Sequence, residues 1–165
     1  MRGVTALVAF LAASPALASA QSAPAADHGA RIFQRCAACH LPNGQGVPGA
    51  FPPLAGRLGE AASTGAGRDY LVMTVAKGVM GEIEIEGRKI RGVMPAQAGL
   101  TDADIAAVLN YAVALKAAGA AATPAPHAFT AEEVASIKAR FTAATPNSVH
   151  AIRAGAFAPS AAESK

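Results

Sequence analysis

The chain has 165 residues, of which 52% are hydrophobic, 15% charged and 5% aromatic, and its formal net charge is +3. Abundant apolar residues with so small a net charge exclude a disordered chain and indicate a globular protein. One pair of cysteines cannot staple a chain of this length, which excludes a disulfide scaffold. Basic and acidic residues are interleaved without a Lys/Arg-rich run, so no nucleic-acid partner is expected.

The N-terminal segment has the pattern of a secretory signal peptide. Arg2 precedes an apolar run over residues 4–17, and residues 18–20 (Ala-Ser-Ala) provide the small residues of a cleavage site. We therefore expect a mature chain that starts at Gln21 and is exported to the periplasm. An uncleaved anchor is the alternative, but the run is shorter than the roughly 20 residues that span a bilayer. After cleavage no membrane span is expected.

The first half of the mature chain predicts two helices separated by a long loop. Asp27 is a suitable N-cap for a short helix to about Arg35. Residues 41–57 are rich in Gly and Pro, which favours an irregular loop wrapped around a site. A second helix is expected over residues 68–77, where apolar residues recur at helical spacing, with Gly78 and Gly81 ending it.

The next segment predicts a hairpin followed by the strongest helical pattern of the chain. Glu and Ile alternate strictly over residues 82–86, and basic residues follow the turn at Gly87, so a short β-hairpin with facing Glu and Lys/Arg side chains is expected. Its charges indicate a solvated face, with a docking site as the alternative. A helix is expected over residues 101–116, opened by an approximate capping box of Thr101 and Asp104. Its apolar face consists of Ile105, Val108, Leu109 and Ala112.

A further helix is expected near the C-terminus. Thr130 and Glu133 resemble a second capping box, and the helix would extend to about Phe141 with an apolar stripe of Val134, Ile137 and Phe141. The expected organisation is a signal peptide (1–20), a flexible lead (21–26), a main domain (27–117), a linker (118–128), a C-terminal helical extension (129–153) and a disordered tail (154–165).

Both cysteines lie in the sequence Cys-Ala-Ala-Cys-His at residues 36–40. Cys-x-x-Cys-His is the attachment signature of c-type haem, in which the thiols add across the vinyl groups and the histidine ligates the iron. We therefore expect Cys36, Cys39 and His40 to bind haem c. No second Cys-x-x-Cys precedes another histidine, so a single haem is expected.

Two alternatives for the cysteine pair are less consistent with its surroundings. A thiol–disulfide redox motif would follow a strand and open a long helix, whereas here a helix precedes the pair and a loop follows. A zinc site would need two further ligands, and His28, His127 and His150 have no zinc-finger spacing.

An electron-carrying haem needs a second axial ligand, and a methionine thioether both fills that position and raises the reduction potential. Met94 is the expected ligand because it precedes Pro95 on a loop whose backbone the proline fixes in an extended form. Met80 is the alternative, although Met73 and Met80 lie in or just after an apolar helix where core packing is the commoner role.

The chain resembles the class I c-type cytochromes over about residues 27–116. Four motifs in order carry the resemblance: residues 36–40, residues 51–56 (Phe-Pro-Pro-Leu-Ala-Gly), residues 81–95 with Met-Pro at their end, and residues 105–111. The resemblance implies an all-α domain around one haem, with a short β-hairpin before the loop of the axial methionine. Its iron would be held by His40 and Met94.

The same resemblance implies contacts that support this site. The carbonyl of Pro52 would accept a hydrogen bond from the His40 ring, which fixes the tautomer. Gly29 and Phe33 of the first helix would pack against Val108 and Tyr111 of the helix expected over residues 101–116.

The implied function is electron transfer between redox proteins, with no bond-making catalysis by this chain. The partners would be a dehydrogenase, an oxidase or a membrane respiratory complex. The segment after Lys116 resembles extensions of cytochrome subunits that accompany periplasmic redox enzymes, so a tightly bound subunit is the alternative. A haem peroxidase, which needs an open sixth position, and a redox sensor are further alternatives.

Overall fold

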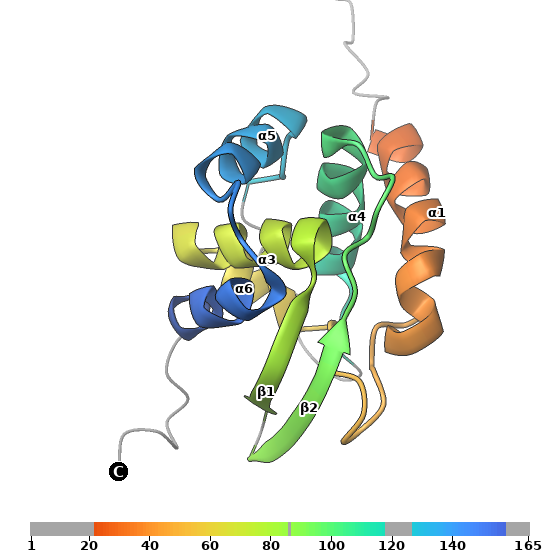
Figure 1. The fold of residues 1–165 in the computed structure, drawn as a ribbon. Helices are drawn as coiled ribbons and strands as arrows, with labels where there is room; N and C mark the ends of the chain where they lie inside the picture. The colour runs from red at the N-terminus through yellow and green to blue at the C-terminus, as the bar shows by residue number, and fades with distance from the viewer. Residues whose placement is uncertain (1–21, 86, 118–126, 158–165) are drawn as a thin grey trace, which may run out of the picture.

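The structure is a computed structural model that describes residues 22–85, 87–117 and 127–157 (Figure 1). The expected signal peptide, most of the expected linker and the last eight residues of the expected tail lie outside these ranges. The elements in order are α1 Ser22–His40, α2 Leu58–Ala62, α3 Gly65–Lys77, β1 Val79–Ile85, β2 Arg88–Met94, α4 Asp102–Ala114, α5 Ala131–Arg140, α6 Pro146–Ile152 and the 3-10 turn η1 Arg153–Gly155. None of the helices described here is long and apolar enough to cross a membrane.

Helices α1 and α4 lie side by side, and glycine permits their close contact (Figure 1). A Cβ atom added to Gly29 would lie 2.3 Å from the carbonyl oxygen of Ala107 and 2.9 Å from Cβ of Tyr111. One turn further along α1, the rings of Phe33 and Tyr111 are in contact, with centroids 5.1 Å apart. The expected packing of the first helix against Tyr111 is therefore present.

Substitution of Gly29 by alanine is expected to lower the free energy of unfolding by about 2 kcal/mol. Forcing a methyl group against the backbone of α4 costs about 1–3 kcal/mol, which outweighs the better helix propensity of alanine. Urea unfolding of the two proteins measures the difference. Gly65→Ala is the matched control, because a Cβ atom there meets nothing within 4 Å. Equal stability of the Gly29 and Gly65 variants would contradict the expectation.

Helix α1 is longer than the sequence predicted at both ends. It begins at Ser22, so residues 22–26 of the expected flexible lead are helical, and Asp27 lies inside the helix and is not its N-cap. Its expected end near Arg35 was wrong, because the helix continues to His40 and includes the whole Cys-x-x-Cys-His sequence. Alanines at positions 37 and 38 favour helix, and the first helix breaker after these alanines is Pro42. Leu41, with φ of 65°, then turns the chain out of the helix. Cys36 and Cys39 are consequently three residues apart on one helical face.

Helix α3 begins earlier than predicted and ends at the predicted glycine. Thr64 is its N-cap, and the Thr64 side chain accepts a hydrogen bond from the backbone N–H of Gly67. Gly78, with φ of 77°, ends the helix. Gly81 was wrongly assigned to that end, since it lies within β1. The short helix α2 had no sequence signal strong enough to predict it.

The predicted hairpin is present and longer than expected. In the antiparallel register Glu82 lies opposite Arg91, and the pairing extends to Val79 opposite Met94. Met94 is therefore the last residue of a strand, not part of a loop as predicted. Glu82 forms exposed ion pairs with Lys89 and Arg91 at 3.0 and 3.8 Å. These pairs are consistent with a solvated face.

The capping box of α4 is confirmed. The Thr101 side chain accepts from the backbone N–H of Asp104, and the Asp104 carboxylate accepts from the backbone N–H of Thr101. The predicted apolar face is buried in the core.

The C-terminal segment folds back onto the rest of the chain. Helix α5 packs against α3 and α4, and α6 packs against α3 and β1 (Figure 1). The predicted stripe contributes to the common core, with Val134 and Ile137 buried and Phe141 partly buried. Helix α6 was not predicted, although Thr145 caps it and Pro146 occupies its first turn. The prediction of a disordered tail from residue 154 was wrong for the first residues of that tail, since Ala156 is buried.

Candidate functional site

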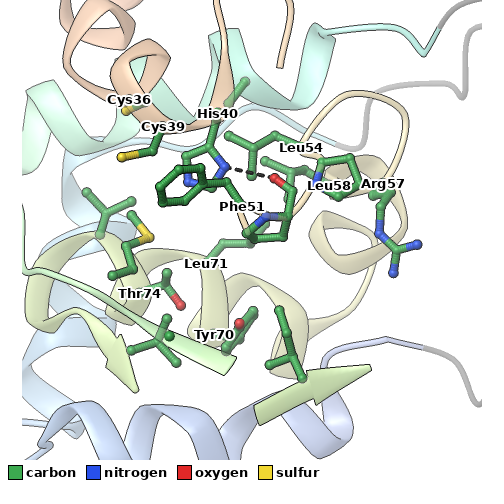
Figure 2. A pocket seen from close by; sticks show the side chains of 18 of the residues that line it. Cys36, Cys39, His40, Phe51, Leu54, Arg57, Leu58, Tyr70, Leu71 and Thr74 are labelled. Carbon is green, nitrogen blue, oxygen red and sulfur yellow. Dashed lines mark hydrogen bonds between the residues drawn. The ribbon is translucent and has the colours of Figure 1, made fainter. Parts of the chain in front are cut away.

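A cavity of about 300 Å³ lies between the end of α1, the loop 41–57, helix α3 and the hairpin. Its lining includes all five residues that the sequence singled out: Cys36, Cys39, His40, Pro52 and Met94. They come from three separate parts of the chain, so the fold brings the predicted site residues together. Figure 2 shows Cys36, Cys39 and His40 side by side at the end of α1.

The two thiols are free and reach the cavity from the last turns of α1 (Figure 2). Cys36 is half-buried and Cys39 is exposed. Burial raises the pKa of the Cys36 thiol, and the neighbouring Arg35 cation opposes that shift. Free thiols one helical turn apart are suited to form two thioether bonds with one flat molecule in the cavity.

His40 is held as a neutral imidazole with one nitrogen available. Its Nδ1 lies 2.8 Å from the carbonyl oxygen of Pro52, which can only accept, so Nδ1 carries the proton (Figure 2). The side chain is buried, and this burial lowers the pKa of the imidazole, while the bond to Pro52 opposes the shift. Nε2 therefore carries no proton, and its lone pair is available to ligate a metal.

The loop 41–57 is folded tightly enough to fix the Pro52 carbonyl. The N–H of Gly46 donates to the carbonyl oxygen of His40 at 2.9 Å, and Val47 and Phe51 form an isolated β-bridge. A Cβ atom on Gly46 would lie 2.4 Å from the carbonyl oxygen of Phe51 and 2.6 Å from that of Pro52. Only glycine fits there, and no sequence pattern indicated that this position is part of the site.

The strand alternation separates Met94 from the other candidate methionines. Val79, Gly81 and Ile83 of β1 line the cavity, so the intervening Met80 lies on the opposite face of the strand and is exposed. Met73 is fully buried in the core outside the cavity lining. Met94 does line the cavity, at the point where β2 ends before Pro95.

The cavity walls fit a large, flat and mainly apolar cofactor with polar edges. Leu54, Leu71, Val75 and Leu109 are among the apolar lining residues. The Thr74 hydroxyl oxygen is buried without a hydrogen bond to the described residues, so it is open to a polar atom of a bound group. Paired thiols, a neutral imidazole and a thioether form the donor set of haem c.

Several lining residues were not predicted. Tyr70 and Thr74 lie on α3, and Arg153 and Phe157 follow α6 (Figure 2 shows Tyr70 and Thr74). Tyr70 and Thr74 are separated by one helical turn, so the helical spacing alone places them on one face of α3. No sequence pattern placed Arg153 or Phe157 near the site.

A mostly helical fold with a Cys-x-x-Cys-His helix end over an apolar cavity defines a c-type haem protein. The family model for cytochrome c matches residues 26–116, and the chain belongs to the cytochrome c family. It is a class I monohaem c-type cytochrome that binds haem c covalently, contains iron and transfers electrons with redox partner proteins.

Two relatives from one organism are similar to most of the chain. Cytochrome c-552 of Thermus thermophilus is 46% identical over 112 residues, which cover 68% of this chain and 85% of the relative. A second cytochrome c-552, from a particular strain of the same organism, is also 46% identical over 112 residues, covering 68% of this chain and 75% of the relative.

Proposed function

We propose that the protein is a periplasmic carrier that passes single electrons between redox proteins, with its iron held between His40 and Met94. One observation carries the proposal. The cavity that contains both thiols is also lined by a neutral His40, fixed through Pro52, and by Met94. A bound haem supplies one-electron chemistry by alternating between ferrous and ferric iron.

The chain's own residues determine how that chemistry is used. Cys36 and Cys39 would hold the haem by thioether bonds, so the carrier cannot lose it. Pro52 keeps the His40 ring in one tautomer and orientation. The thioether of Met94 would raise the reduction potential, and the mainly apolar walls of the cavity would limit the contact of a bound haem with water.

The same donor set supports a carrier function in place of an enzymatic one. His40 and Met94 would occupy both axial positions, whereas a peroxidase needs an open position for its substrate. The described residues contain no group of three His, Cys, Asp or Glu side chains that could hold a further metal ion.

Two features of the structure support transient contact with partners. The stripe of Val134 and Ile137, which could have served as a subunit interface, is buried in the chain's own core. Phe51 and Val93 line the cavity and are 40% and 64% exposed, so a small apolar contact area lies at its edge. Small contacts of this kind are typical of redox encounters. A dehydrogenase, an oxidase or a membrane respiratory complex is the proposed kind of partner.

The test is the absorption spectrum of the oxidised mature protein together with two methionine variants. Wild-type protein is expected to be low-spin, with the long-wavelength charge-transfer band of a methionine–iron bond. Met94→Leu should lose this band and lower the reduction potential while the haem stays covalently attached. Met80→Leu is the matched control and should leave both properties unchanged. A high-spin wild-type spectrum, or loss of the band in the Met80 variant alone, would overturn the proposed ligand set.

A further inference from the structure

The C-terminal segment forms part of the wall of the cavity, although it lies outside the residues that match the family. His150, Arg153 and Phe157 all line the cavity. Nε2 of His150 lies 2.7 Å from the carbonyl oxygen of Glu82, and its ring lies against Gly81, where a Cβ atom would be 2.7 Å from the imidazole. The segment is thus fitted closely onto the hairpin beside the site.

Arg153 is the cation that this segment brings to the cavity. Its Nη2 donates to the carbonyl oxygen of Glu84 at 3.3 Å, and its guanidinium carbon lies 5.0 Å from the centroid of the Phe157 ring. No ion pair joins Arg153 to a carboxylate among the described residues. A guanidinium has five N–H donors in a fixed fork, so the bond to the Glu84 carbonyl leaves donors that, among the described residues, no carboxylate takes.

The groups around Arg153 favour an anion at this end of the cavity. Tyr70 packs against Phe157 with ring centroids 6.0 Å apart, and Arg57 lies 5.7 Å from the centroid of the same Phe157 ring. Burial raises the pKa of the Tyr70 phenol, and the Arg153 cation opposes this shift, as expected for close neighbours. The Tyr70 side chain is therefore a neutral hydrogen-bond donor at neutral pH.

The two acidic side chains of β1 that the structure describes do not face this end of the cavity. Ile83 and Ile85 of β1 line it, so the alternating Glu82 and Glu84 side chains lie on the opposite face of the strand. Glu82 is paired there with Lys89. Among the described residues that line the cavity, the wall at Arg153 thus presents a cation and a phenol and no carboxylate.

We propose that Arg153 binds a propionate carboxylate of the haem, so that the C-terminal segment takes part in cofactor binding and in setting the reduction potential. The inference rests on the proposed haem site. A guanidinium pairs with a carboxylate through charge-assisted and often bidentate hydrogen bonds. In the alternative, purely structural role, Arg153 only fastens η1 to β1 through the Glu84 carbonyl.

The electrostatic consequence separates the two roles. Oxidation adds a positive charge at the iron, and a fixed cation in a partly desolvated site disfavours that charge. Arg153 should therefore favour the reduced state, and its loss should lower the reduction potential. A purely structural anchor would affect thermal stability without a specific change at the propionates.

The experiment compares Arg153→Gln with Arg31→Gln in the haem-loaded protein. Arg31 is exposed on α1 outside the cavity lining, so its variant removes the same charge without touching the site. Arg153→Gln should lower the potential by more than the control and shift the propionate-bending mode in the resonance Raman spectrum. Arg153→Lys, which keeps the charge, should restore most of the potential.

The possible outcomes lead to different conclusions. An unchanged potential and propionate mode in Arg153→Gln, with haem covalently attached, would overturn the role of Arg153 and leave the carrier function intact. A fall in melting temperature alone would assign Arg153 the structural role and also overturn the proposal. Wild-type protein without attached haem would instead overturn the proposed haem site itself.

Discussion

Replacement of both Cys36 and Cys39 by alanine is expected to give a mature chain without covalently attached haem and without cooperative unfolding. Removal of the thiols leaves no group that can form a thioether bond. Without haem, the apolar walls of a cavity of about 300 Å³ lose their packing partner. At about 24 cal/mol per Å³ the cost has an upper bound on the order of 7 kcal/mol, comparable with the total stability of a domain, about 5–15 kcal/mol.

Intact mass and circular dichroism measure the two parts of this expectation. The variant's mass should equal that of the bare polypeptide, and its thermal transition should be broad or absent. Ala38→Ser is the matched control, because it alters the same turn of α1 and keeps both thiols. A double variant that retained haem through extraction in acid and organic solvent would contradict the assigned attachment.

The proposed haem-binding residues could be selected from the sequence because their spacing is local. Cys-x-x-Cys-His and Met-Pro are short patterns whose chemistry can be interpreted without the fold. The structure also contains the hydrogen bond from His40 to the Pro52 carbonyl that the family resemblance implied. Gly46 was missed because its requirement arises from two carbonyl groups that approach it only in the folded loop.

The residues at which helices and strands begin and end were less predictable than the presence of these elements. Helix α1 was expected to end too early because the Cys-x-x-Cys-His sequence was treated as separate from the helix that precedes it. Met94 was assigned to a loop, but pairing with Val79 extends β2 to that residue. Strand pairing depends on a partner elsewhere in the chain, so local propensity does not determine where a strand ends.

The role of the C-terminal segment could not be obtained from its sequence. The stripe of Val134, Ile137 and Phe141 indicated an apolar helix face, but a pattern of this kind does not identify what covers the face. In the structure the covering elements are α3 and α4. The placement of Arg153 in the cavity wall depends on this packing, which is why no motif predicted it.

A buried charge network also holds the C-terminal segment to α3. Arg68 is 4% exposed, and its guanidinium forms a two-pronged interaction with Glu133, with both N–O distances at 2.5 Å. Its Nη1 donates to the carbonyl oxygens of Ala62 and His127, and its carbon lies 3.7 Å from the centroid of the Phe129 ring. Glu133 was expected to complete a capping box, but its carboxylate binds Arg68 instead.

Glu133→Gln is expected to lower the free energy of unfolding by about 3 kcal/mol at neutral pH, because it leaves a buried guanidinium without its counter-charge. The hydrogen bond from Arg68 holds the pKa of Glu133 below its usual value. A carboxyl group with a lowered pKa in the folded state stabilises the fold above its unfolded pKa, which is about 4.3. That contribution is lost as the pH falls through the lower folded pKa, so the difference between wild type and variant should shrink on acidification.

Denaturant unfolding of the haem-loaded proteins at neutral pH and at a series of acidic pH values measures this difference. Glu132→Gln is the matched control, since it removes the same charge from the first turn of α5 without contacting Arg68. The control should lower stability by less than about 1 kcal/mol, the range of a charge interacting with a helix N-terminus. Equal losses in the two variants, or a Glu133 effect that is constant across the acidic range, would show that the Arg68 pair does not hold the C-terminal segment.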